Sequence, residues 1–476
     1  MVPSLAGGMA GAGGGAGTDE PAGAVPEASR PGPGPGLYLH IPFCSAICPY
    51  CDFAVLTGGP RRRAEFVDSL EAEIAAWRPE AERWRTIDTV YFGGGTPSAL
   101  APEQLARILA AARAALPIAE DAWIALEANP EDVTAESVAR WRDLGIAMLS
   151  HGIQSFDAAT LRFLGRRHTP EQATRAVELA LGAGFPIVSI DLIYGVGGAG
   201  GAGEAGESGH REAAEPPRAS PEPAHGPVHR GGPPMPPAQA LAPRDRGRLR
   251  QPDREAEQAR WRRDLEQAVA LGPQHLSCYQ LTIHEGTPFG YRAARGELGE
   301  SPEADQAEAF RFTHTFLASQ GYAAYEVSNF ARSPEHQSRH NRKYWDHTPY
   351  LGLGPSAHSF DGRRRWWNER KLRPWQAKLA AGERPIAGSE TLGRRELALE
   401  ELMLSLRTPT GLDLEAFRRR HACDLAAINR PLIADLASRG LLAETAGRLV
   451  PSLAGLAVAD SLARGFDLGD LDERGA

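Results

Sequence analysis

The sequence predicts an α/β fold: a partial, TIM-like (β/α)6 barrel, followed by a C-terminal extension and a small helical domain. Three observations lead to this prediction. Short apolar runs alternate with helical patterns up to about residue 290, polar residues follow the ends of those runs, and leucines at helical spacing begin after Arg394. Because crossovers between parallel strands are right-handed, they curve such a sheet toward a barrel.

The first half of the chain supplies six strands and the helices between them. The apolar runs are typical of buried strands and lie at 37–41, 89–92, 123–126, 148–153, 187–193 and 275–281. Helical patterns lie between them, near 61–78, 102–116, 131–144, 170–184 and 257–271. Further strand and turn elements are expected around Glu326 and Tyr350, continuing the sheet.

Two segments are too poor in large apolar residues to form a core. Residues 1–36 and 196–256 are rich in Gly, Ala and Pro, so burial cannot offset the entropy of ordering them. We therefore expect a disordered N-terminal tail and a disordered insertion that loops out of a folded domain. The remaining domains are predicted at 37–290 for the barrel, 291–386 for an α/β extension and 387–476 for the helical domain.

Composition and charge narrow the class of protein. The chain has 476 residues and a net charge of -8, which gives no reason to expect nucleic-acid binding. It has no apolar run long enough to span a membrane and no visible secretory signal. The predicted location is therefore the reducing cytoplasm, where clustered thiolates survive.

Three of the five cysteines lie in one short loop behind the first predicted strand. Cys44, Cys48 and Cys51 follow the spacing CxxxCxxC. Disulfide geometry disfavours cysteines this close together, and an odd number of cysteines would leave one thiol unpaired. An iron–sulfur cluster is the favoured interpretation. A zinc site that adds His40 and a set of reduced structural cysteines are the alternatives.

Polar residues and glycines follow the other strands at equivalent positions. Gly93, Gly94 and Gly95 follow the second strand, where absent side chains would let backbone amides approach a ligand. Glu127 ends the third strand, Gln154 ends the fourth and Asp191 lies in the fifth. Because the carboxyl ends of parallel strands form the ligand-binding edge, these side chains are expected at one mouth.

The cysteine spacing, with Tyr50 just before the last cysteine, resembles the signature of the radical S-adenosylmethionine (SAM) superfamily. Several motifs together resemble its oxygen-independent coproporphyrinogen III oxidase-like family, and within that family the heme chaperone branch; they are YLHIPFC from Tyr38, GGGTPS from Gly93, EANP from Glu127, GIQSF from Gly152, LGRRH from Leu164 and DLIYG from Asp191. The resemblance covers roughly residues 37–465 apart from the insertion and makes 37–290 a radical SAM domain.

The resemblance also implies cofactors and their ligands. Cys44, Cys48 and Cys51 would hold a 4Fe–4S cluster with one iron left open to bind SAM. The residues implied around SAM are Tyr38, Tyr50, Gly94, Gly95, Thr96, Glu127, Gln154, Arg166 and Asp191.

Two places separate the branches of this family. Coproporphyrinogen oxidases carry a fourth cysteine two residues after the third, whereas this chain has Phe53, as the chaperone branch does. The segment 340–345, HNRKYW, is similar to the HNxxYW motif of that branch, so His340 is the predicted axial heme ligand, with a packed or surface histidine as the alternative. The predicted function is therefore a heme chaperone that transfers heme to a haemoprotein, and the alternative is a coproporphyrinogen III oxidase.

The sequence does not say whether SAM is cleaved, so enzymatic activity stays open, as do the recipient haemoprotein and the oligomeric state, a homodimer being one option. His151 occupies a strand position that is usually aliphatic in the family, and the insertion interrupts the expected chain course, so the site could be looser than in relatives. The C-terminal segment resembles the family's small helical, winged-helix-like domain. Cys278 and Cys423 are expected to be core residues.

Overall fold

The computed structural model of the protein describes residues 33–197 and 254–471. Residues 1–32 of the predicted tail and nearly all of the predicted insertion lie outside the described residues. The predicted end of the tail at residue 36 needs correction, because Gly34 N donates to Asp88 Oδ2 (2.9 Å) and the first strand already begins at Gly36. From Gly34 onward, the chain belongs to one compact unit.

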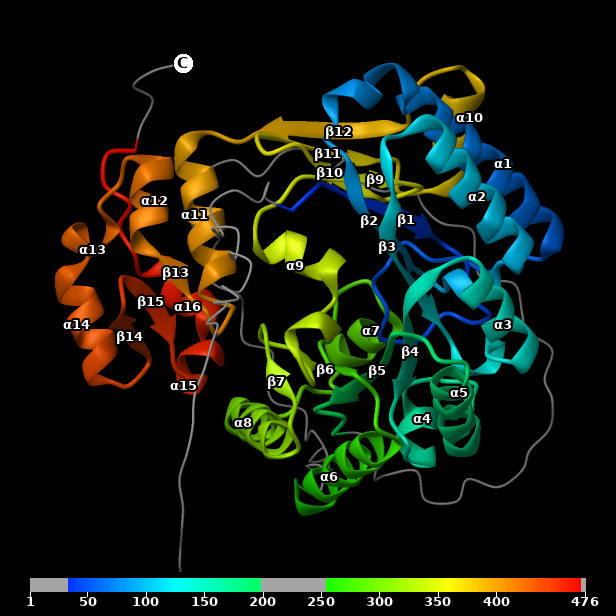
Figure 1. Ribbon diagram of the computed structural model, residues 1–476. Coiled ribbons are helices and arrows are strands. Elements are labelled where there is room, and N and C mark those ends of the chain that lie inside the picture. Colours follow the sequence, from blue (N-terminus) through cyan, green and yellow to red (C-terminus); the bar gives the residue numbers. More distant parts are fainter. Residues whose placement is uncertain (1–32, 198–253, 472–476) are drawn as a thin grey trace, which may run out of the picture. The chain divides into compact units, whose positions relative to one another are not determined.

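A twelve-stranded sheet organises this unit, in the order β12-β11-β10-β9-β1-β2-β3-β4-β5-β6-β8-β7. Its six central strands run parallel in chain order, which confirms the predicted parallel sheet. They are β1 (Gly36–Ile41), β2 (Ile87–Gly94), β3 (Ile118–Ala128), β4 (Ile146–Gln154), β5 (Ile187–Tyr194) and β6 (His275–Gln280). Figure 1 shows these strands as an arc with α1, α2, α3, α5 and α6 on its outer side.

The extension adds strands at both edges of this arc. β9 (Tyr350–Leu353) pairs parallel with β1, and the antiparallel strands β10 (His358–Phe360), β11 (Arg364–Asn368) and β12 (Ile386–Thr391) follow it. At the other edge, β8 (Asn329–Ala331) and β7 (Ala323–Ala324) continue antiparallel from β6. Because β12 and β7 are edges, the described strands form a partial barrel and do not close.

Helices connect the parallel strands and bury one apolar face each. They are α1 (Pro60–Trp77), α2 (Pro102–Ala115), α3 (Ala135–Asp143), α4 (Ala158–Phe163), α5 (Pro170–Gly182) and α6 (Arg254–Leu271). In α1, Phe66, Leu70 and Ile74 are buried at four-residue spacing, as expected for an amphipathic helix on a sheet. Thr169 and Gln172 form a capping box that fixes the start of α5.

The predicted boundaries of the insertion need correction at both ends. Val196 is buried in an apolar cluster with Ile193 and Leu281, so the folded chain extends past Tyr194. At the other end, α6 begins at Arg254, three residues before the predicted helix. Polar residues at the first turn of a helix carry no apolar periodicity, which is why the sequence placed its start too late.

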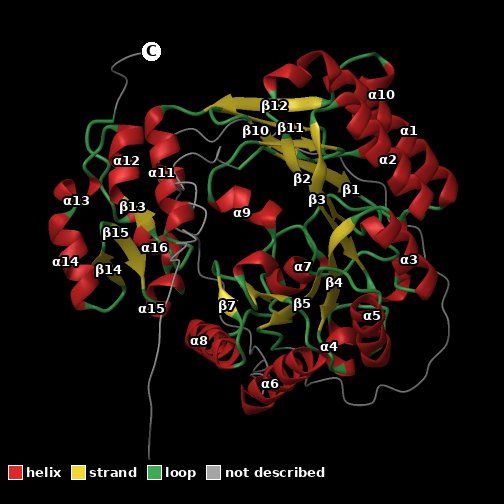
Figure 2. Cartoon of the chain, in the orientation of Figure 1, coloured by secondary structure: helices red, strands yellow, loops and turns green. Residues whose placement is uncertain are grey.

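The extension contributes four further helices, shown in red in Figure 2. They are α7 (Pro288–Ala294), α8 (Glu303–Ser319), α9 (Arg339–Trp345) and α10 (Leu372–Ala380). Buried Glu73 of α1 ties this region to the barrel because it accepts hydrogen bonds from Gly354 N (2.8 Å), Asn368 Nδ2 (2.5 Å) and Trp375 Nε1 (3.0 Å). Short 3-10 helices lie at Arg78–Arg83, Pro97–Ala99, Pro130–Asp132 and Pro334–His336.

The C-terminal region has its own apolar core, which includes Leu402, Phe417, Leu436 and Leu449. Its helices are α11 (Arg394–Ser405), α12 (Leu414–His421), α13 (Leu425–Ile428), α14 (Arg430–Ser438), α15 (Leu453–Leu456) and α16 (Ala459–Arg464). Besides the predicted helices it contains a three-stranded sheet of β13 (Leu412–Asp413), β15 (Arg448–Pro451) and β14 (Leu442–Thr445). Cys278 and Cys423 are buried, as predicted. No helix among the described residues is long and apolar enough to cross a membrane.

Candidate functional site

A cavity of about 430 Å³ lies at the carboxyl ends of the parallel strands. Its lining brings together eleven of the twelve residues predicted for the cluster and SAM: Cys44, Cys48, Tyr50, Cys51, Gly94, Gly95, Thr96, Glu127, Gln154, Arg166 and Asp191. The twelfth, Tyr38, lies outside this lining and borders a neighbouring cavity. Residues predicted from the ends of the strands therefore line one shared cavity. Their assignment as ligands remains a prediction.

The cysteine loop is held at the end of β1 by backbone bonds. Cys44 N donates to Leu56 O (3.0 Å), and Cys51 N donates to Cys48 O (3.1 Å). All three thiols are free and partly exposed. Burial raises the pKa of the Cys44 thiol, and that of Cys51 to about 11, so metal binding at these positions must displace protons.

Two side chains donate hydrogen bonds to these sulfurs. Thr96 Oγ1 lies 3.5 Å from Cys44 Sγ, and Arg166 Nη1 lies 3.5 Å from Cys48 Sγ. Hydrogen bonds and positive charge near thiolate ligands are known determinants of the reduction potential of iron–sulfur clusters. Three thiols on one loop with such donors fit a cluster that leaves one iron without a protein ligand.

The zinc alternative finds little support in this geometry. His40 Nδ1 shares a hydrogen bond with Tyr38 Oη (3.1 Å), and its Nε2 shares one with Ala54 O (3.1 Å). Within the described part of the chain, no three His, Cys, Asp or Glu side chains converge closely enough to hold a single metal ion. A four-iron cluster is larger than one ion, so this absence bears on zinc alone.

The glycine triplet is required by close packing. A Cβ on Gly94 would lie 2.5 Å from His40 Nδ1, and the residue has φ +111°; a Cβ on Gly95 would lie 2.8 Å from Phe43 O. The amides do not point to a ligand in this conformation, because Gly94 N donates to Glu127 Oε2 (3.1 Å) and Gly95 N donates to Ile41 O (2.8 Å). The interpretation that these two amides approach a ligand directly needs correction accordingly.

Glu127 is a half-buried carboxylate that accepts hydrogen bonds from two donors. Besides Gly94 N, Tyr91 Oη donates to its Oε1 at 2.8 Å. Burial raises the pKa of Glu127 to about 7, so its two protonation states are nearly balanced at neutral pH. Such a group can accept a hydrogen bond from a ligand hydroxyl or pair with a ligand cation.

Asp191 faces the same cavity from β5. Ser150 Oγ lies 3.1 Å from both carboxylate oxygens of Asp191, and burial raises the pKa of this carboxyl to about 6. Gln154 ends β4 in the left-handed region, at φ +69°, where the register between β4 and β5 shifts. Non-glycine residues rarely adopt this conformation, and such residues cluster at functional sites.

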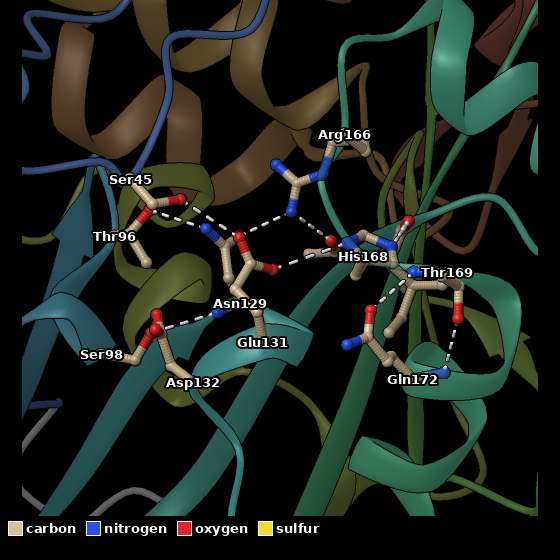
Figure 3. A network of polar contacts seen from close by, with 12 residues as sticks. Ser45, Thr96, Ser98, Asn129, Glu131, Asp132, Arg166, His168, Thr169 and Gln172 are labelled. Carbon is tan, nitrogen blue, oxygen red and sulfur yellow. Dashed lines mark hydrogen bonds and ion pairs between the residues drawn. The ribbon is translucent and has the colours of Figure 1, made fainter.

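Arg166 is anchored beside the cluster loop by a network of polar contacts (Figure 3). Its Nη2 donates to Asn129 Oδ1 (2.6 Å) and to Gly152 O (2.8 Å), while Asn129 Nδ2 donates to Thr96 Oγ1 (3.1 Å). Asn129, Ser150 and Tyr91 were not predicted as site residues. Asn129 follows Glu127 at the end of β3, which is a strand-end signal the sequence offered; Ser150 and Tyr91 sit inside strands and gave none.

His340 is fully buried and has partners on both ring nitrogens. Its Nδ1 shares a hydrogen bond with Thr89 Oγ1 (2.9 Å) and its Nε2 shares one with Tyr344 Oη (3.1 Å). Burial lowers the pKa of His340 to about 3. Its role as an axial heme ligand stays a prediction, one that requires the side chain to leave these partners.

His151 is also buried, with Nδ1 3.2 Å from Ser189 O and no hydrogen-bond partner for Nε2 among the described residues. It lies next to Ser150 on β4, and successive side chains of a strand point to opposite faces. Since Ser150 contacts Asp191 in the cavity, His151 points away from it. His151 therefore replaces the expected aliphatic residue on the face of β4 that points away from the cavity.

Comparison with known proteins identifies the class of the protein. Residues 38–200 match the Radical SAM superfamily, and residues 392–458 match the HemN C-terminal domain. The solved structure of the Escherichia coli coproporphyrinogen III oxidase HemN aligns with a TM-score of 0.68 at 21% identity, covering 92% of this chain and 91% of that one. Fold and cysteine loop together define a radical SAM protein, a class whose members bind a 4Fe–4S cluster and SAM.

Curated relatives narrow this class to one family. The heme chaperone HemW of Mycobacterium tuberculosis is 33% identical over 442 residues, covering 92% of this chain and 96% of the relative. The Lactococcus lactis heme chaperone HemW is 30% identical, covering 91% and 98%, and that of E. coli K12 is 33% identical, covering 68% and 69%. The chain belongs to the HemW family.

Proposed function

We propose that this protein is a heme chaperone that binds heme and passes it to a recipient haemoprotein. The observation that carries the proposal is the family membership, since relatives named heme chaperone HemW match nearly the whole chain. Phe53, at the position where the resemblance places a further cysteine in the oxidases, supports the same branch.

In this proposal, Cys44, Cys48 and Cys51 hold the 4Fe–4S cluster. When bound at its open iron, SAM would lie in the 430 Å³ cavity, where Glu127 and Asp191 offer oxygens for its hydroxyl and amino groups. Arg166 and Thr96 hold the loop and its sulfurs in place. The cluster and SAM would then control the state of the protein during heme transfer, in the cytoplasm.

Anaerobic reconstitution followed by a heme titration tests the proposal. A heme chaperone should show saturable growth of the Soret band, with about one heme per chain. Addition of an apo-haemoprotein from the source cell should then shift the band to that of the acceptor. Absence of saturable heme binding in the cluster-loaded protein would refute the proposal.

The competing function is oxidative decarboxylation of coproporphyrinogen III. It is favoured by one observation, the fold similarity to E. coli HemN over 92% of the chain, and a fold supports more than one function. The two functions differ in a measurable product, because only the oxidase consumes coproporphyrinogen and SAM together.

A further inference from the structure

A second cavity, of about 400 Å³, adjoins the cluster cavity. Asp52, Phe53, Gly94 and Glu127 border both cavities. The other walls of the second cavity come from β1, from Ala54, from α9, from the start of β9 and from residues 356–370 around β10 and β11. A volume of this size is within the range of small-molecule sites, which is roughly 300–1,000 Å³.

The walls of this cavity suit a flat aromatic ligand. Phe53 is 65% exposed, which is unusual for a side chain of this size. Tyr344 and Tyr350 meet edge to face, with ring centroids 4.8 Å apart. These rings offer apolar surface to a macrocycle, and aromatic pairs favour such offset arrangements.

The cavity also contains an imidazole without a hydrogen bond. Two histidines line it, His40 and His358, and both nitrogens of His40 are engaged. His358, at the start of β10, is exposed, and within the described residues neither of its ring nitrogens has a hydrogen-bond partner. Its ring stacks on Trp367 at 6.0 Å with an interplanar angle of 29°, which holds its plane. Partial shielding of the ring from solvent, and then the charge of Arg365, lower the pKa of His358 and favour the neutral form that metals bind.

A cation completes the rim. Arg370 is exposed and donates from Nη2 to Asp52 O (2.8 Å), which fixes the guanidinium beside Phe53. Of the two acidic groups at this cavity, Asp52 lies 3.7 Å from His284 Nδ1, and Glu127 accepts hydrogen bonds from Tyr91 and Gly94. Guanidinium groups pair well with carboxylates such as heme propionates.

We propose that heme binds in this second cavity, with His358 as an axial ligand of its iron and Arg370 paired with a propionate. This inference rests on the proposed function and locates its cargo. It assigns ligation to His358, because His340 is buried with both nitrogens bonded while His358 is exposed at a cavity. The heme would lie beside the cluster cavity, with Phe53 between them.

Parallel titrations of the full chain with hemin and with iron-free protoporphyrin IX test this assignment. His358→Ala should weaken hemin binding by about tenfold or more and shift its Soret band, since iron loses a ligand. The same variant should bind iron-free protoporphyrin within about twofold of wild type. Arg370→Gln should weaken both ligands by about two- to fivefold, since an exposed ion pair contributes little.

His336→Ala is the matched control, because His336 lies on a short 3-10 helix outside both cavities. Thermal unfolding of each variant checks that it is folded. If His358→Ala binds hemin as wild type does while His340→Ala does not, the ligand is His340 and this inference fails while the proposed function stands. If wild type binds no hemin, both fail.

Discussion

The cysteine loop and helix α9 were both predicted to bind iron, yet they present their ligating atoms differently. The thiols of Cys44, Cys48 and Cys51 are partly exposed at a cavity, and their hydrogen bonds, from Thr96 and Arg166, are long. In α9, His340 is buried and bonded at both nitrogens. The comparison shows that the cysteine loop offers accessible ligating atoms in this conformation, whereas His340 would have to leave its present partners to bind iron.

Lys343 of α9 reinforces this contrast. Its Nζ lies 2.5 Å from Asp88 Oδ1 and donates to Gly34 O at 2.5 Å. Figure 1 places α9 on the inner side of the strand arc, and its two buried side chains, His340 and Lys343, contact residues of β2. In this conformation α9 fastens the extension to the barrel.

The largest effect is expected in the cysteine loop. Replacing Cys44, Cys48 and Cys51 together with Ala should reduce iron from about four atoms per chain to none and remove the visible absorption of the cluster. Iron and sulfide analysis after anaerobic reconstitution measures this. Cys278→Ala is the matched control, because Cys278 is buried away from the loop. Iron retained in the triple variant would contradict the assignment.

A large loss of stability is expected in α9. His340→Ala should lower the free energy of unfolding by about 2–4 kcal/mol, because it leaves a cavity and removes the partners of Thr89 and Tyr344. His358→Ala, at an exposed position, should cost less than about 0.5 kcal/mol. Urea titration of both variants measures the difference. Equal free energies of unfolding for the two variants would contradict a structural role of His340.

The raised pKa of Glu127 should be visible in the pH dependence of the free energy of unfolding. Its pKa in the folded protein is raised to about 7 by burial, so its contribution is fully present below the unfolded pKa of about 4.5 and is lost as pH rises through about 7. Glu127→Gln removes this titration while an amide can still bond Tyr91 and Gly94. Relative to the variant, wild type should lose about 1–3 kcal/mol between pH ~4.5 and ~8. Unfolding midpoints that move in parallel for the two proteins would argue against a raised pKa.

The smallest effect is expected at Thr96. Thr96→Val keeps the shape but removes the donor to Cys44 Sγ. If one hydrogen bond to a ligand sulfur contributes about 1 kcal/mol, the cluster potential should fall by about 40 mV. A redox titration followed by electron paramagnetic resonance measures this. An unchanged potential would mean that this bond does not persist in the cluster-loaded protein.

The parallel sheet and the cavity were predictable because strand periodicity and strand-end polarity are local in sequence. Glu127 and Asp191 line the same cavity because β3 and β5 end at the same edge of the sheet. This follows from the parallel order of the strands, which the sequence pattern predicts. The contact of His340 with Thr89 could not be predicted, since 251 residues separate the two. The contacts of Tyr91 with Glu127 and of Ser150 with Asp191 could not be predicted either, because they depend on which face of each strand points into the cavity. Within the predicted winged-helix-like domain, no strand could be placed from the sequence, because β13, β14 and β15 have only two, four and four residues.

The most direct test of the central claim compares heme retention with coproporphyrinogen consumption in one preparation. The cluster-loaded protein is incubated anaerobically with SAM, a reductant and either hemin or coproporphyrinogen III, and porphyrins are quantified by chromatography. We expect about one bound heme per chain and no loss of coproporphyrinogen. Conversion of coproporphyrinogen to protoporphyrinogen over many turnovers, without stable heme binding, would contradict it.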